Sequence, residues 1–166
     1  GLKPQQRKDL EKLYLRRVDP DRIVTTLLAN RMMGFSLETD RQVGILVDRG
    51  GRVTHVIVGD AERIWIPDLG RERAGSRRLR GLRLVHTHPG GELLSLDDVL
   101  DLTRLRLDLI AALIPDATGT NPLVSAAYPV YAPGTPDPYE KIGPVPLSAL
   151  ELDFLGLVQA LEEELQ

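Results

Sequence analysis

The chain has 166 residues, of which 42% are hydrophobic and 27% charged, and a net charge of −3. This length and composition predict one domain with a buried core. The absence of cysteine excludes disulfides and thiolate metal sites, and no run reaches the roughly 20 apolar residues that would predict a membrane span. The charged N-terminus does not look like a signal peptide, so we expect a cytoplasmic protein without a membrane partner.

The first part of the chain predicts two helices. Residues 5–16 carry apolar side chains at helical spacing, and so do residues 21–34. Gly34 is expected to end the second helix. Residues 1–36 are therefore interpreted as an N-terminal helical segment.

From residue 42 the apolar pattern becomes that of strands. Residues 42–47 and 53–58, joined by the turn at 48–51, predict a hairpin. Short strands are expected at 63–66 and 82–88, followed by a helix at 96–106. Residues 107–113 fit a helix or a strand, and the short apolar run closed by Pro115 favours a strand. A further strand is expected at 123–131.

The end of the chain predicts a crossing segment and a helix. Residues 132–146 are rich in proline, which favours an extended, irregular path. A final helix is expected over 147–165, and residues 147–166 would lead into a further part of a longer protein. With residues 37–131 as its core, the chain is predicted to be a single α/β domain with a mixed sheet flanked by helices.

The most informative segment runs from His86 to Asp98. A strand places His86 and His88 on one face, because side chains alternate along a strand. Together with Asp98 they form a set of nitrogen and oxygen ligands that zinc can bind. For hydrolysis at such a metal, Glu38 is the best-placed upstream carboxylate for a general base, and Ser95 could donate to an oxyanion. The alternative is that Ser95 and Asp98 simply cap a helix and that the histidines hydrogen-bond into that cap.

A second feature is a run of arginines between residues 71 and 83. Either it is a solvated loop, or it contacts phosphate, such as that of RNA. No aromatic residue is interleaved with these arginines, so base stacking has no obvious support. The candidate contact residues are Arg73, Arg77, Arg78 and Arg80, whereas His55 is expected to be an ordinary half-exposed side chain.

The histidine segment resembles the signature of the JAMM/MPN metalloproteases. His86-Thr87-His88-Pro89 and Ser95-Leu96-Asp97-Asp98 match its His-x-His-Pro and Ser-x-x-Asp parts. The resemblance implies a JAMM-like or deaminase-like core. The family's glutamate aligns with Arg41, so Glu38 could serve only in a shifted register.

A second resemblance covers nearly the whole chain: it looks like the N-terminal extension of HflX-family GTPases. The resemblance implies an accessory domain of a ribosome-associated protein. GTP and magnesium would bind only to another domain of that protein, and no GTP-binding residue is carried over to this chain. The expected partners are that GTPase domain and the ribosome or its RNA, not DNA. The matching segments are 13–18, 41–49, 55–61, 66–71, 80–88, 97–102, 105–112 and 153–164.

Three functional hypotheses follow. The first is a binding or regulatory module that is not catalytic by itself. The second is a zinc-dependent hydrolase of isopeptide or amide bonds. The third is a structural spacer in which the histidines serve only the local helix cap.

Overall fold

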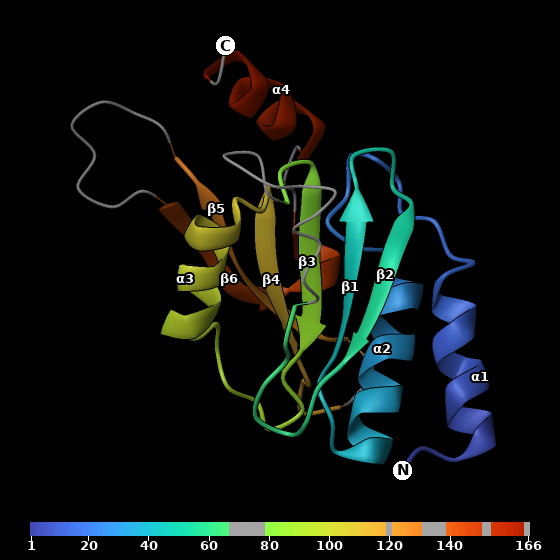
Figure 1. The fold of residues 1–166 in the computed structure, drawn as a ribbon. Coiled ribbons are helices and arrows are strands. Elements are labelled where there is room, and N and C mark those ends of the chain that lie inside the picture. Colours follow the sequence, from blue (N-terminus) through green and yellow to red (C-terminus); the bar gives the residue numbers. More distant parts are fainter. Residues whose placement is uncertain (67–78, 119–120, 131–138, 151–153, 165–166) are drawn as a thin grey trace.

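A computed structural model describes residues 1–66, 79–118, 121–130, 139–150 and 154–164. Its centre is a six-stranded mixed sheet in the order β2-β1-β3-β4-β5-β6 (Figure 1). The strands are β1 (Val43–Asp48), β2 (Val53–Val58), β3 (Leu82–Thr87), β4 (Leu109–Ile114), β5 (Leu123–Pro129) and β6 (Tyr139–Pro146). The helices are α1 (Pro4–Leu13), α2 (Thr26–Thr39), α3 (Leu96–Leu105) and α4 (Phe154–Glu164), with a short 3₁₀ turn, Leu147–Ala149. The predicted α/β domain with a mixed sheet is confirmed.

One parallel strand pair determines where the ends of the elements meet. β3 and β4 run parallel, and the other neighbouring strands are antiparallel. A parallel pair needs a crossover connection, and α3 supplies it. The start of α3 therefore follows directly on the turn that leaves the end of β3.

The sheet separates two apolar clusters, and the side-chain alternation of each strand contributes to both. The larger cluster contains Val85 of β3 and the buried apolar residues of α2, whereas the other contains Leu84 and the buried apolar residues of α3. β3 is buried along its whole length, because α2 packs on one face and the cluster that contains Leu84 covers the other. This is why its sequence is apolar apart from residues with specific polar partners.

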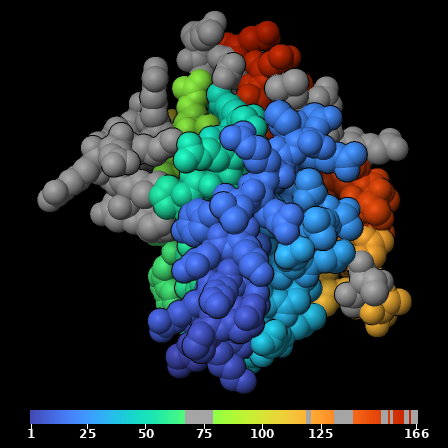
Figure 2. All heavy atoms as spheres, turned by 90° about the vertical axis from the view of Figure 1, so that its right-hand side faces the viewer, coloured from blue at the N-terminus to red at the C-terminus, as the bar shows by residue number. Residues whose placement is uncertain are grey.

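The N-terminal helices cover one side of the sheet. α1 packs against α2 and β2, and Figure 2 shows the N-terminal residues (blue) spread over this side of the molecule. The prediction that Gly34 ends the second helix was wrong. α2 continues to Thr39 and ends at Asp40, whose φ of 51° is left-handed. Phe35 and Ser36 are buried, so packing offsets the intrinsic cost of a glycine within the helix.

Other predicted elements have mixed outcomes. The hairpin is confirmed, and β4 confirms the strand that was favoured for 107–113. No strand forms at 63–66. There the chain makes a tight loop in which the Asp60 carboxylate accepts hydrogen bonds from the backbone N–H groups of Glu62 and Arg63.

The C-terminal predictions also need correction. The second half of the proline-rich segment is not irregular, because residues 139–146 form β6 at the edge of the sheet. Prolines are tolerated on an edge strand, where a missing N–H does not break an internal ladder. α4 begins at Phe154 rather than at 147. No helix in the described part of the chain is long and apolar enough to cross a membrane.

Arg83, the last member of the arginine run, is not a surface residue. It is 1% exposed, and its guanidinium donates to the backbone carbonyls of Arg22, Ile23 and Asp48 at 2.8–3.0 Å. The guanidinium also lies 4.5 Å from the centre of the Phe154 ring. Burial lowers the pKa of Arg83 to about 10, against the opposing influence of Asp108 and Asp48, so the side chain stays charged at neutral pH. Arg83 therefore fixes β3 to the N- and C-terminal segments.

Candidate metal centre

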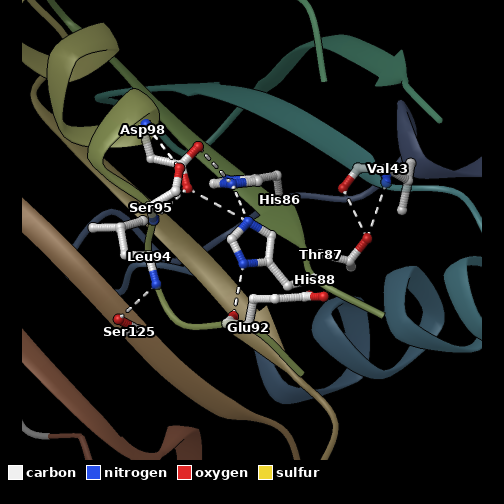
Figure 3. Close-up of polar contacts among 9 residues, drawn as sticks. All are labelled: Val43, His86, Thr87, His88, Glu92, Leu94, Ser95, Asp98 and Ser125. Carbon is white, nitrogen blue, oxygen red and sulfur yellow. Dashed lines mark hydrogen bonds and ion pairs between the residues drawn. The ribbon is translucent and has the colours of Figure 1, made fainter. Parts of the chain in front are cut away.

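The end of β3 and the start of α3 bring the predicted ligands together. His86 is 0% exposed and His88 is 4% exposed, and both face Asp98 in the first turn of α3 (Figure 3). Thr87 points to the opposite face, as strand alternation requires. Among the described residues, this trio is the one group of histidines and carboxylates close enough to hold a metal ion.

The predicted helix cap is present as well. The Ser95 hydroxyl accepts a hydrogen bond from the Asp98 N–H at 3.1 Å, and the Asp98 carboxylate accepts one from the Ser95 N–H at 3.0 Å. This is a capping box, and it holds the carboxylate in a fixed rotamer toward the histidines. The Asp98 side chain therefore takes part in both the helix cap and the His-His-Asp cluster.

The distances suit a tetrahedral site. The two histidine Nε2 atoms are 3.0 Å apart, and each lies near a different oxygen of Asp98: His86 Nε2 is 3.2 Å from Oδ1, and His88 Nε2 is 3.4 Å from Oδ2. With one ligand atom taken from each residue, the three atoms lie within 4.8 Å of one another. Zinc–ligand bonds of about 2.0–2.1 Å give a tetrahedral edge of about 3.3 Å. The three side chains can thus hold a metal ion with little movement.

The two histidines differ in their second hydrogen bond. His88 Nδ1 lies 2.7 Å from the backbone carbonyl of Glu92, so Nδ1 must carry a proton, and Nε2 is the nitrogen that could bind a metal. Such a contact fixes the tautomer of a metal ligand. His86 Nδ1 is buried and has no hydrogen-bond partner among the described residues. Among the described residues, His88 therefore has a hydrogen-bond partner for its Nδ1 atom, whereas His86 has none.

The cluster is electrostatically coupled. Burial works against the charged form of Asp98, but hydrogen bonds from His86 and His88 outweigh it and hold the pKa of this carboxyl well below its ordinary value. Burial likewise works against the charged form of His88, yet contacts with Asp98 and Glu92 raise the pKa of His88 above 6.5. The carboxylate is therefore ionised at neutral pH and available as a ligand.

A cleft of about 420 Å³ opens beside the cluster, and Ser95 lines it. Gln42, at the start of β1, and Asp101, one turn after Asp98 on α3, line it too. Burial, together with the charge of Asp98, raises the pKa of Asp101. Helical spacing from Asp98 is a sequence signal that could have predicted Asp101 as part of this cleft.

Glu38 does not reach the site. It lies near the end of α2, where its carboxylate accepts a hydrogen bond from Gln6 at 3.1 Å, and it borders a different cavity between α1 and α2. Arg41, at the position of the JAMM glutamate, donates to the carbonyl of Gly59. The structure therefore contradicts the placement of Glu38 as a general base, since α2 covers the sheet face opposite to the histidines.

The other predicted functional residues are only partly described. Arg73, Arg77 and Arg78 lie outside the described residues, and Arg80 is half-buried in the turn before β3. His55 is half-buried on β2, as expected, and its ring lies 3.0 Å from the Thr54 hydroxyl.

Two supporting contacts were missed by sequence reasoning. The Glu92 contact uses a backbone carbonyl, which leaves no trace in the residue type. The Leu94 N–H donates to the Ser125 hydroxyl on β5, a contact over 31 residues that no local pattern predicts. Both contacts hold the turn between His88 and Ser95 against the sheet (Figure 3).

Comparison with known proteins identifies no family for this chain. No protein-family model, no curated protein and no solved structure matches the chain.

Proposed function

We propose that this domain binds one zinc ion through His86, His88 and Asp98. The observation that carries the proposal is that one ligand atom from each of the three buried side chains lies within 4.8 Å of the other two. The Glu92 carbonyl supports it, because it directs the bare nitrogen of His88 toward the other two ligands. Two histidines and a carboxylate also suit iron(II), so the test must identify the element.

The test is metal analysis by mass spectrometry of protein purified without chelators, before and after zinc is offered at neutral pH. About one zinc per chain is expected, and it should be lost in a His86→Ala/His88→Ala variant. A His55→Ala variant, which removes the third histidine, should keep the metal. A wild-type protein that takes up no metal would contradict the proposal. Stoichiometric iron would show that the site binds iron instead of zinc.

For the biological role, we propose an accessory, regulatory domain of an HflX-like, ribosome-associated GTP-binding protein in the cytoplasm. The resemblance along the sequence supports this role. Glu38 is remote from the site, so a catalytic role could not use the general base that the sequence suggested. GTP and magnesium would bind to another domain, and the ribosome or its RNA would be a partner of the whole protein.

The matching experiment uses the whole protein. Deleting residues 1–166 should change ribosome co-sedimentation or GTP hydrolysis, and neutralising Arg77, Arg78 and Arg80 should weaken a salt-dependent association with RNA. Unchanged behaviour in both assays would instead favour a structural spacer.

The cleft supports a second candidate, a zinc-dependent amide or isopeptide hydrolase. His88, Asp98 and Ser95 all border this cleft, so a substrate could approach the ligands. Zinc lowers the pKa of bound water toward 7. Ser95 would donate to the developing oxyanion, and Asp101 would take the proton-transfer role expected of Glu38. Full peptide-hydrolase activity in a His88→Ala variant would reject this candidate.

A further inference from the structure

We infer that Thr87, the residue between the two histidines, is a positioning residue for the metal site, acting through a buried chain of hydroxyl groups on the opposite face of the sheet. This inference rests on the proposed metal binding. Thr87 and Ser36 are both 0% exposed, so neither hydroxyl has water as an alternative partner.

The chain runs from Val43, just before the last β1–β3 backbone pair, through Thr87 to Ser36 on α2. The Val43 N–H donates to the Thr87 hydroxyl at 2.9 Å, and the Thr87 hydroxyl donates to Ser36 Oγ at 2.8 Å. The Ser36 hydroxyl in turn donates to the carbonyl of Arg41. The Thr87 hydroxyl also lies within hydrogen-bond distance of the Val43 carbonyl, at 3.3 Å, so its single proton has two acceptors within reach and no donor in the chain is left unused.

This chain of hydrogen bonds continues the link between β1 and β3 beyond the point where their backbone pairing ends. The antiparallel ladder of β1 and β3 ends at the pair Gly44–His86. One residue further, the N–H of Val43 bonds to the Thr87 side chain instead of to a backbone carbonyl. On the other edge of β3, the backbone N–H of His88 donates to the carbonyl of Leu113 at 2.8 Å. His86 itself still pairs with Gly44 of β1, but the chain beyond it is held from β4 by backbone and from β1 by the Thr87 hydroxyl.

The consequence concerns the ligands, although Thr87 touches none of their ring atoms. Figure 3 shows its hydroxyl pointing toward Val43, away from Asp98, while both imidazoles point toward Asp98. Without the hydroxyl, β3 is held near His88 on one edge only, so the two Nε2 atoms lose their fixed spacing. Groups that orient metal ligands from outside the coordination sphere typically contribute about 10–100-fold in metal affinity.

The test compares zinc affinity among variants of the whole chain. Thr87→Val keeps the β-branched shape and removes the hydroxyl, and we expect its zinc dissociation constant to rise about 10-fold or more. Thr87→Ser keeps the hydroxyl and should stay within about 2-fold of wild type. Val85→Ala lies on the same strand and the same face and creates a cavity, so it controls for simple destabilisation.

A second readout separates positioning from stability. Cobalt(II) bound in place of zinc reports its coordination geometry in the visible spectrum, and Thr87→Val should alter this spectrum whereas Val85→Ala should not. If wild type binds no metal, the proposed function itself fails. If wild type binds and Thr87→Val binds equally well with the same spectrum, only the positioning role is rejected. Should Thr87→Val not fold, Thr87→Ala removes the same hydroxyl and its contacts to Val43, and an unchanged affinity and spectrum in that variant would likewise reject the role.

Discussion

Asp98 belongs to both the helix cap and the His-His-Asp cluster, so two variants can separate its roles in capping and in the proposed metal binding. Ser95→Ala removes the hydroxyl that accepts from the Asp98 N–H but leaves all three ligand side chains. Asp98→Asn keeps an oxygen that can accept from the Ser95 N–H but replaces the charged ligand with a weak, neutral one. The two variants should therefore fail in different assays.

The magnitudes follow from the contacts. Loss of an N-cap hydroxyl costs about 1 kcal/mol, which lowers the melting temperature of a domain this size by about 2–4 °C. Zinc at 100 times its dissociation constant stabilises by about 2.7 kcal/mol, which corresponds to a rise of about 5–10 °C. Ser95→Ala should melt lower and keep most of that rise, whereas Asp98→Asn should lose it.

The assay is thermal unfolding followed by circular dichroism, with and without zinc, at constant pH and protein concentration. The zinc-induced rise is the informative quantity, because Asp98→Asn also changes the metal-free protein by removing the contacts to His86 and His88. An undiminished rise in Asp98→Asn would refute Asp98 as a ligand. If zinc does not raise the melting temperature of the wild type, the three side chains serve only the helix cap.

Three further predictions concern the metal-free protein. The pKa of Asp98 is lowered from its ordinary value of 3.8, so its ionised form stabilises the protein above that pH, and this stability is lost on acidification. The pKa of His88 is raised from its ordinary value of 6.5, so its charged form stabilises the protein below that pH, and this stability is lost as the pH rises. Denaturant titrations should therefore find the contribution of this pair greatest between about pH 4 and 6.5, and a maximum that Asp98→Asn leaves unchanged would contradict the coupling. Arg83→Met should lower the unfolding free energy by about 2 kcal/mol or more, because three buried carbonyls lose a charged donor. The exposed Arg104→Met is its control, and equal losses in the two variants would count against the buried network. Gly34→Ala should raise the unfolding free energy by about 0.5–1 kcal/mol, since the new methyl group meets open space within a helix; destabilisation would mean that α2 does not continue through this position.

Much of the fold and site could be predicted from local patterns. The hairpin follows from the turn at 48–51 between two apolar runs, and β4 from a short apolar run closed by Pro115. The capping box at Ser95 and Asp98 and the common face of His86 and His88 follow from helix and strand periodicity. These features depend on residues a few positions apart, so the sequence alone determined them.

Other features depended on contacts between distant segments. Glu38 was interpreted as a general base because it precedes β1, but the three-dimensional path of α2 places it on the other side of the sheet. Arg83 has the residue type of a surface cation, yet three carbonyls from two separate segments hold it in the core. The chain from Val43 through Thr87 to Ser36 joins residues 44 and 51 positions apart. Local propensity carries no information about such partners, because their free energy arises only when packing brings them together and removes water.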